Sequence, residues 1–439
     1  MHAPSPVHLL RSLIRFNTTN GINPERPCVE YLGRLLSEAG LATEFLAKDP
    51  QRPNLLARLP GRGEAPPLLL YGHVDVVGVE GQRWTHPPFE GSVVDGCVWG
   101  RGAVDMKGGL AMMAAALLRV RAEGMTPPGD VIFAAVSDEE AGGEYGSRFL
   151  VEKHADRFAG VRYALGEVGG FTLVAMGRRF YPVMVAEKQA CWLKVTFRGP
   201  AGHGSMPPAG SAMTKMAEAM RHIESVRLPV HVTPTARAQF TAMARALPLP
   251  AAAGLRLLLV PWLTDRILGR LGERATVFGP ALHNTVTPTM TTAGTAPNVV
   301  PAEAILHLDG RILPGFGRDD LVREVRDVIG DEPEIEVLHH DPGPAEPDMG
   351  LYDLLAGVIT ELDPEGVPVP MLLPGTTDAR FFSRLGIQTY GFTPMKLPPD
   401  LDFSALFHGE DERVPVSALE FGADAVYRVL LRAGDPSRQ

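Results

Sequence analysis

The chain has 439 residues, of which 45% are hydrophobic and 21% are charged. This length favours two or more domains, and the apolar content is enough to bury a large core, which argues against a disordered chain. The formal net charge of −9 argues against binding to nucleic acid or to an anionic membrane, since both require a basic surface.

The first 190 residues alternate short apolar runs with helical segments. Residues 68–71 and 131–136 are apolar runs typical of buried strands, and the Ala- and Leu-rich residues 108–120 predict a buried helix. Alternation of this kind predicts an α/β fold with a mainly parallel sheet covered by helices on both faces.

The pattern changes near Lys188. Residues 192–197 alternate between apolar and polar as in a half-buried strand, and a helix is expected over 211–226. Further elements are expected as strands over 286–292, 304–312 and 334–338 and as a helix over 318–329. This set indicates an α+β domain whose antiparallel sheet carries helices on one face.

An Ala-, Leu- and Arg-rich stretch, residues 236–274, lies within this second region. Its composition predicts helix, interrupted at Pro248, Pro250 and Pro261. We expect its apolar side chains to belong to the core, with a wall for an acyl chain as the alternative. These side chains are Leu255, Leu257, Leu258, Leu259, Trp262 and Leu263.

The chain then returns to the style of its first part, with helices expected over 350–362 and 417–431 and a loop over 375–380. The second domain is therefore expected to be inserted in the first. The predicted boundaries place residues 1–189 and 345–439 in the first domain and 190–344 in the inserted one.

His73 and Asp75 come at the end of the first apolar strand, in the run Gly72-His73-Val74-Asp75. Residues two apart on a strand point the same way, and α/β sheets place their sites at the carboxyl ends of parallel strands. A metal-binding imidazole donates its other N–H to a neighbouring group, which Asp75 is suited to orient. Taken alone, the pattern favours a structural histidine paired with a carboxylate.

Acidic residues and a second histidine lie in further loops. Asp105 stands among glycines just before a helix, where it either aims into a site or caps the helix. Glu139 and Glu140 follow the strand at 131–136, where carboxylates require a positive partner such as a metal ion unless the loop is solvated. Glu167 lies in a Gly-rich turn, and His408 lies late in the chain. Together these nitrogen and oxygen donors suit zinc, cobalt or manganese better than a thiolate or an oxygen-only site.

Five runs then occur in a fixed order along the chain: GHVDVV, GRGAVDMKGG, SDEEAGG, GEVGG and FHGEDERV. In this order they resemble the M20 family of metallopeptidases, which includes aminoacylases, glutamate carboxypeptidases and deacylases of biosynthetic intermediates. The segment WTHPPFEG resembles the carboxypeptidase-S and aminoacylase-like branch. The resemblance covers nearly the whole chain and implies a zinc-peptidase catalytic domain with an inserted α+β lid and dimerisation domain.

The resemblance further implies two divalent metal ions per chain, zinc before cobalt or manganese. Asp105 would bridge the two ions. His73 and Glu167 would complete the ligands of one ion, and Glu140 and His408 would complete those of the other.

Catalytic and substrate-binding roles follow from the same resemblance. Glu139 would be the general base, Asp75 would orient His73, and His203 would stabilise the oxyanion. Asn298 and Arg311 would contact substrate. Arg380 is a candidate to bind the substrate carboxylate, because a guanidinium group binds carboxylates with two hydrogen bonds. Without the family, the residues alone favour His203 as a loop residue, Asn298 as a turn residue and Arg311 as the ion-pair partner of Asp309, and they leave open a surface ion pair of Arg380 with Asp378.

The function implied is metal-dependent hydrolysis of the amide bond of an N-acyl amino acid or short peptide with a free carboxylate. The alternatives are a dipeptidase or carboxypeptidase, a biosynthetic N-deacylase and a non-catalytic metal-binding homologue, against which the presence of Glu139 and all five ligands argues. We expect a homodimer formed through the inserted domain, and neither nucleic acid nor membrane as a partner. Three scattered cysteines without a CxxC pair, and an N-terminus unlike a signal peptide, predict a cytoplasmic protein.

Overall fold

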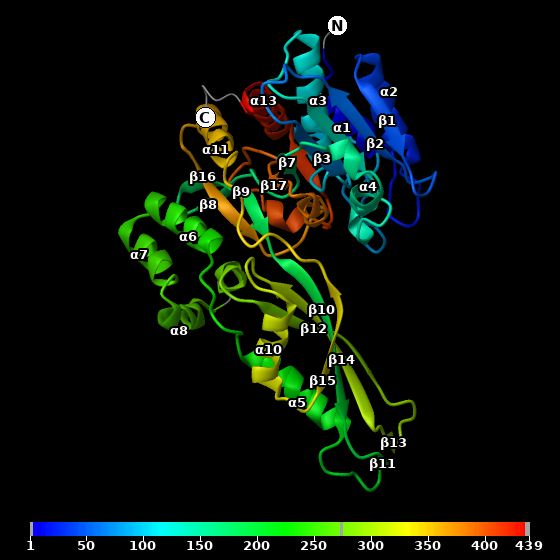
Figure 1. Cartoon of the computed structure of the whole chain (residues 1–439), viewed down its shortest axis with the longest axis vertical. Coiled ribbons are helices and arrows are strands. Elements are labelled where there is room, and N and C mark those ends of the chain that lie inside the picture. Colours follow the sequence, from blue (N-terminus) through cyan, green and yellow to red (C-terminus); the bar gives the residue numbers. More distant parts are fainter. Residues whose placement is uncertain (1–2, 273–274, 435–439) are drawn as a thin grey trace. The chain divides into compact units, whose positions relative to one another are not determined.

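The computed structural model describes residues 3–272 and 275–434 and divides the chain into two compact units (Figure 1). The first unit comprises Met1–Val185, Asp348–Met371 and Thr377–Gln439, and the second comprises Ala186–Pro347 and Leu372–Thr376. The predicted helical stretch 236–274 and the predicted first domain include residues 273–274, 1–2 and 435–439, which lie outside the described residues. No helix within the described ranges is both long and apolar enough to cross a membrane.

The first unit combines helices with a large sheet. Its helices are α1 (Pro6–Ile14), α2 (Arg26–Glu38), α3 (Lys107–Ala122), α4 (Ser147–Lys153), α11 (Tyr352–Leu362), α12 (Ala379–Phe382) and α13 (Val416–Arg432). Its strands are β1 (Ala42–Leu46), β2 (Asn54–Leu59), β3 (Leu68–His73), β4 (Ser92–Val94), β5 (Cys97–Trp99), β6 (Val131–Val136), β7 (Tyr163–Gly166), β8 (Leu173–Ala175), β17 (Gln388–Gly391) and β18 (Arg413–Pro415). Two strands, β9 (Arg178–Glu187) and β16 (Gly366–Leu373), continue from this unit into the second.

The main sheet has the order β1-β2-β6-β3-β7-β17-β9-β16, with β8 paired to β9. Its centre is parallel, because β3 pairs with β6 and β7, and β7 pairs with β17, all in the same direction. The flanking pairs β1–β2, β2–β6 and β17–β9 are antiparallel. The predicted α/β class with a parallel sheet is therefore confirmed for the centre of the sheet.

Alternate residues of the central strands face two separate cores, as the two-residue repeat of a strand requires. Leu68 and Leu70 of β3 pack in a cluster with α1, α2, α3, α11 and α13. Leu69 and Tyr71 pack in the opposite cluster, with residues of α4 and α12. Helices thus cover both faces, which is why every residue of β3 and β6 is buried.

A small three-stranded sheet joins a strand from the last thirty residues of the chain to two strands from the first hundred. β18 pairs with β5, and β5 pairs with β4, both antiparallel. Because β18 begins at Arg413, this pairing brings residues 408–412 close to the segment between β5 and α3, which contains Asp105.

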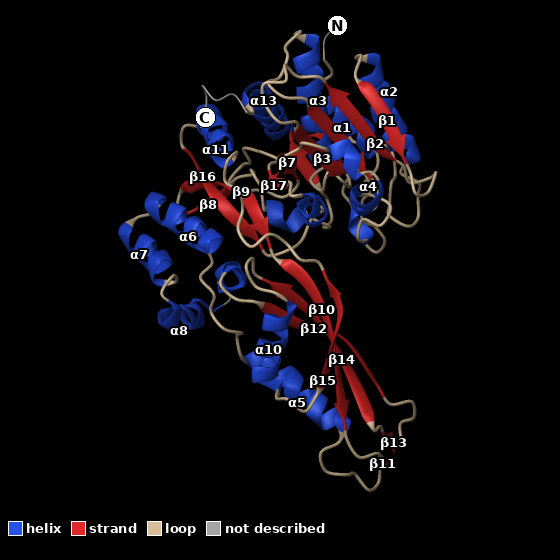
Figure 2. Cartoon of the chain, viewed as in Figure 1, coloured by secondary structure: helices blue, strands red, loops and turns tan. Residues whose placement is uncertain are grey.

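The second unit is built on an antiparallel sheet of order β12-β14-β10-β15, flanked by helices (Figure 2). Its strands are β10 (Gln189–Arg198), β11 (Gly202–His203), β12 (Thr285–Ala293), β13 (Val299–Val300), β14 (Glu303–Ile312) and β15 (Glu334–His340). Its helices are α5 (Ala212–Ser225), α6 (Pro234–Ala246), α7 (Leu249–Leu257), α8 (Pro261–Leu271), α9 (Ala275–Phe278) and α10 (Arg318–Ile329). Leu193, Val195 and Phe197 of β10 pack against α5 and α10, whereas Trp192 points to the exposed face.

The prolines of the second unit divide its helical stretch as predicted. Pro248 and Pro250 lie at the start of α7, and Pro261 begins α8, where the missing N–H costs nothing. The expectation that the apolar side chains here all belong to the core is wrong in part. Leu255 and Leu258 are buried, but Leu257 and Trp262 are exposed.

Candidate metal centre

Three neighbouring parallel strands end at one edge of the first unit's sheet. β3 ends at His73, β6 is followed by Glu139 and Glu140, and β7 is followed by Glu167. Since the carboxyl ends of parallel strands meet at the same edge, these side chains converge. Asp105 joins them from the segment before α3.

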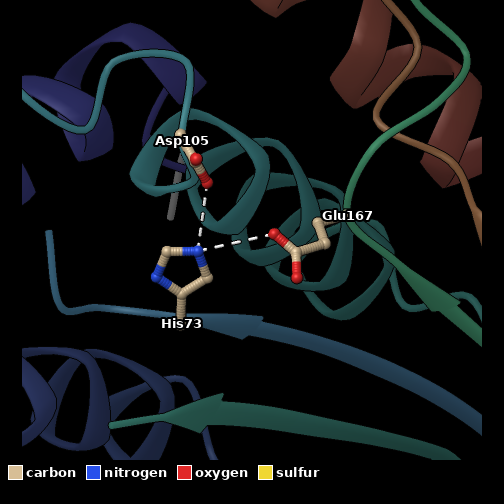
Figure 3. Close-up of side chains that lie close together, drawn as sticks. All are labelled: His73, Asp105 and Glu167. Atoms are coloured by element: carbon tan, nitrogen blue, oxygen red, sulfur yellow. Dashed lines mark hydrogen bonds and ion pairs between the residues drawn. The ribbon is translucent and has the colours of Figure 1, made fainter. Parts of the chain in front are cut away.

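His73, Asp105 and Glu167 form one cluster (Figure 3). The His73 Nε2 atom lies 3.1 Å from the Asp105 Oδ1 atom and 3.5 Å from the Glu167 Oε2 atom. The other ring nitrogen of His73, Nδ1, donates to the backbone carbonyl of Asp75 at 2.9 Å, which orients the ring so that Nε2 faces the carboxylates.

A second cluster shares Asp105. The His408 Nε2 atom lies 3.2 Å from the other Asp105 oxygen, Oδ2, and 3.3 Å from the Glu140 Oε2 atom. Asp105 therefore offers one oxygen to each cluster. This is the arrangement of a carboxylate that bridges two cations.

The buried carboxylates of this centre would be stabilised by bound cations. His73, Glu167 and Asp105 are largely or completely buried, and hydrogen bonds with Asp105 and Glu140 raise the pKa of His408 to about 10. Glu140 has a second oxygen, Oε1, that is buried and has no hydrogen-bond partner among the described residues. A buried carboxylate oxygen without a donor is costly, and a divalent ion is the partner that imidazole and carboxylate donors suit.

Asp75 acts on the loop after β6 more than on His73. Its carboxylate accepts the backbone N–H groups of Glu139 and Glu140, at 3.2 and 3.1 Å, and the Asn20 side-chain amide at 2.6 Å. The Asp75 carboxylate lies 3.5 Å from the His73 ring, farther than its own carbonyl oxygen. Asp75 thus fixes the position of both glutamates.

Glu139 lies next to Glu140 but has a different electrostatic environment. Burial is the largest cause that raises the pKa of Glu139 well above its usual value, and the carboxylates of Glu167 and Asp378 add to it. A carboxylate with a raised pKa accepts a proton near neutral pH more readily than an ordinary surface glutamate.

Glu412 is the site residue that sequence reasoning missed. It is fully buried and accepts the backbone N–H groups of Gly102, Val104 and Asp105, at 2.9, 2.6 and 3.1 Å. Its second contact is an ion pair of 2.8 Å with Arg101, which is also buried. Glu412 therefore holds the turn that presents Asp105. Glu412 belongs to the same run, FHGEDERV, as His408, and this position could have identified it as a site residue. Only the histidine of that run was proposed as a site residue from the sequence.

Positive backbone φ angles gather around the centre. Asp138, Val168 and His408 have φ of 69°, 57° and 57°, and each precedes, follows or provides a candidate ligand. For a β-branched residue such as Val168 this conformation is a clear outlier, and such outliers persist where the surrounding structure holds a functional site in place.

Arg380 lies in α12 of the first unit rather than in the predicted loop. Asp378, its partner in the alternative role of a surface ion pair, is buried, accepts from Ser147 Oγ at 2.7 Å and interacts electrostatically with Arg380. Burial raises the pKa of Asp378 to about 7. Asp378 also raises the pKa of Glu139, so the segment that carries Arg380 adjoins the centre.

The remaining three predicted residues belong to the second unit. His203 and Asn298 lie in or beside the short β11–β13 pair, where the Asn298 carbonyl accepts from the Gly204 N–H at 2.8 Å and His203 contacts Ser205. Arg311 makes a two-pronged ion pair with Asp309, at 2.9 and 3.0 Å, and donates to Thr376.

Comparison with known proteins identifies the family. The model of the peptidase family M20/M25/M40 matches residues 69–432. The human N-fatty-acyl-amino acid synthase/hydrolase PM20D1 is 28% identical over 84% of this chain and 74% of its own length. Probable carboxypeptidase S-like 2 of Dictyostelium discoideum is 28% identical over 83% of this chain and 71% of its own, and aminoacylase-1 of Sus scrofa is 26% identical over 97% and 94%.

Solved structures share the fold. The M20 family metallo-carboxypeptidase Sso-CP2 of Sulfolobus solfataricus superposes with a TM-score of 0.70 at 14% identity, covering 97% of this chain and 98% of that one. A dinuclear metal binding peptidase of the M20 family from Bacillus subtilis superposes with a TM-score of 0.59 at 14% identity, covering 98% and 99%. The family resemblance of the sequence motifs is thereby confirmed: the chain belongs to the M20 peptidase family and is a hydrolase of amide or peptide bonds.

Proposed function

We propose that this enzyme hydrolyses the amide bond of N-acyl amino acids with a free carboxylate, at a centre of two divalent metal ions with Glu139 as the general base. The proposal rests above all on Asp105, whose two oxygens each belong to a separate cluster of candidate ligands.

The residues present fit two cations. His73, Asp105 and Glu167 would hold one ion, and Asp105, Glu140 and His408 would hold the other, with the unpartnered oxygen of Glu140 available as a donor. Mixed imidazole and carboxylate donors favour zinc, with cobalt or manganese as alternatives. When bound, such ions polarise a carbonyl and lower the pKa of a water molecule.

Glu139 performs the proton transfers. Its carboxylate accepts a proton as a water oxygen attacks the amide carbonyl carbon, and then donates that proton to the nitrogen as the C–N bond breaks. The products are a carboxylic acid and a free amino group. Asp75 keeps Glu139 in place through the backbone N–H bond of 3.2 Å.

Four further residues are proposed to act on the substrate. Arg380 would bind the substrate carboxylate, because a guanidinium group binds carboxylates with two parallel hydrogen bonds. Asn298 and Arg311 would contribute further contacts and His203 would stabilise the oxyanion.

Two further parts of the proposal concern the whole protein. The described cysteines are all unpaired thiols, which is consistent with a cytoplasmic location. Homodimerisation would proceed through the second unit, in the region of residues 190–344.

The decisive test compares Glu139→Gln with Glu144→Gln, a matched change of an exposed glutamate nearby. Both metal-loaded proteins are assayed for amine release from N-acetyl amino acids, longer N-acyl amino acids and dipeptides, with and without a chelator. We expect the wild type and Glu144→Gln to release amine from the N-acyl set unless chelated. Glu139→Gln should lose on the order of 10²–10⁴-fold in kcat while keeping its metal.

Near-normal turnover of Glu139→Gln would contradict its role as the base. Chelator-sensitive release from dipeptides alone would instead make the enzyme a dipeptidase. Turnover that no chelator affects would refute the metal centre.

A further inference from the structure

Helix α7 of the second unit exposes leucines on the face that it does not bury. Ala252 and Leu255 face the core that α6, α7 and α8 share. The opposite face carries Leu249 and Leu257, eight residues and thus about two turns apart, which are 81% and 45% exposed. A soluble helix normally places polar residues on the face that it does not bury, so this stripe requires an explanation.

Helix α8 continues the exposed surface with an aromatic residue and cations. Trp262 is 67% exposed, and the Arg266 guanidinium lies 5.7 Å from the centre of its ring. Arg270, one turn further along, is exposed on the same face. α7 packs against α8 in the structure, and only three residues separate Leu257 from the start of α8. We call the exposed side chains Leu249, Leu257, Trp262, Arg256, Arg266 and Arg270 the α7–α8 face.

The charge of this region is opposite to that of the chain. Between Pro234 and Leu271 the sequence has five arginines and one acidic residue, Asp265, which gives a net charge of +4 within a chain of −9. The arginines are 237, 245, 256, 266 and 270, and all are exposed. None of them pairs with a carboxylate within the described part of the chain, and Asp265 instead contacts His283 at 3.1 Å.

We propose that the α7–α8 face docks onto an anionic phospholipid surface. Helices that lie in a membrane interface bury leucine and tryptophan in the acyl boundary, while arginines beside them contact lipid phosphates. The face has this combination of side chains, and its arginines have no carboxylate partner among the described residues. On α7 the exposed leucines Leu249 and Leu257 lie beside the exposed Arg256, which is the pairing of aliphatic and cationic side chains that a lipid interface binds.

The net charge of the whole chain argued against binding to an anionic membrane. That value sums the charges of both units, so it does not describe the local charge of this face. A cation near a membrane surface responds to lipid charge within about one Debye length, roughly 8–10 Å, so local charge decides the interaction.

The test measures sedimentation of the full-length protein with vesicles of phosphatidylcholine, with or without phosphatidylserine. We expect binding to the serine-containing vesicles, weaker binding as salt rises, and a blue shift of tryptophan emission. Replacing Arg256, Arg266 and Arg270 together by Gln should lower the partition coefficient on the order of a hundredfold, about fivefold for each arginine.

Matched variants separate the face from general surface effects. Leu257→Ser should weaken binding, whereas Leu338→Ser, at an equally exposed leucine (46%) on β15, should not. Arg34→Gln, on an exposed residue of the first unit, is the charge control. All variants should hydrolyse a short N-acetyl amino acid as the wild type does, so loss of vesicle binding is distinguishable from a failure of the proposed function.

Equal binding to both vesicle types, or none to either, would overturn the proposal, as would loss of binding in the Leu338→Ser or Arg34→Gln control. A second copy of the chain is the competing occupant. If Trp262→Ala converts a dimer to a monomer in sedimentation without lipid, the face is a contact between copies and not a membrane surface.

Discussion

The carboxylates around Asp105 in the first unit and the arginines of the α7–α8 face in the second are charged groups in opposite surroundings. Glu412 is fully buried, and each of its oxygens has donors. Arg256, Arg266 and Arg270 are exposed and have no carboxylate partner within the described ranges. A buried charge must be paired to be tolerated, whereas an exposed one costs little. A buried charge therefore indicates which part of the structure it stabilises. Exposed charges without a carboxylate partner instead remain available to bind an external ligand.

The largest effect is expected for Asp105→Asn. Because Asp105 belongs to both ligand clusters, its loss should weaken binding of both ions and lower activity by more than about a hundredfold, the upper effect of losing an outer partner of a metal site. The measurement is metal content by mass spectrometry after dialysis, together with kcat. Asp95→Asn, at an exposed turn with φ of 50° that Asn also adopts, is the control. Full metal content in Asp105→Asn would contradict the role of Asp105 as a ligand of both ions.

The next effect tests a buried carboxylate without a proposed metal contact. Glu412→Ala leaves Arg101 buried and unpaired, so the free energy of unfolding should fall by about 3–5 kcal/mol. Glu410→Ala, at an exposed position of the same motif, should change it by less than about 0.5 kcal/mol. Chemical denaturation measures both. Equal stability of the two variants would mean that Glu412 is not the support of the Asp105 turn.

A smaller effect is expected at Asp363, a buried carboxylate with its own cations. Burial by itself would raise its pKa, but hydrogen bonds from Arg179, Tyr181 and Lys396 outweigh burial and lower the pKa to about 2. The unfolded chain has a value of about 3.9, so the ionised group stabilises the folded chain above that pH.

This stabilisation, about 2 kcal/mol, should be lost as the pH falls from about 4 toward 2. In Asp363→Asn the acid-induced decrease in unfolding free energy over that range should be smaller by the same amount. Denaturant titrations at several pH values measure it. An unchanged pH dependence in Asp363→Asn would show that the cations do not stabilise the buried carboxylate.

Elements whose signal is local can be predicted from the residues alone. Residues 131–136 form β6 as predicted, since a short, wholly apolar run next to a turn has few alternatives to a buried strand. Pro248, Pro250 and Pro261 separate α6, α7 and α8, because proline is tolerated in the first turn of a helix but breaks a helix in its interior. The order of the five glycine- and acid-rich runs identified the family, and the residues at the strand ends were the ones that the parallel sheet brings together.

Contacts between groups that are distant in sequence could not be predicted in this way. Neither the bonds from Glu412 to the Asp105 turn nor the contact of Asp75 with the Glu139 backbone follows from sequence spacing, since each joins segments that pair only through the sheets. The same is true of α7, where Leu255 and Leu257 are chemically identical and one is buried while the other is exposed. Sequence records a residue's chemistry and its local periodicity, but burial and partners depend on what packs against it, and those contacts exist only in the folded chain.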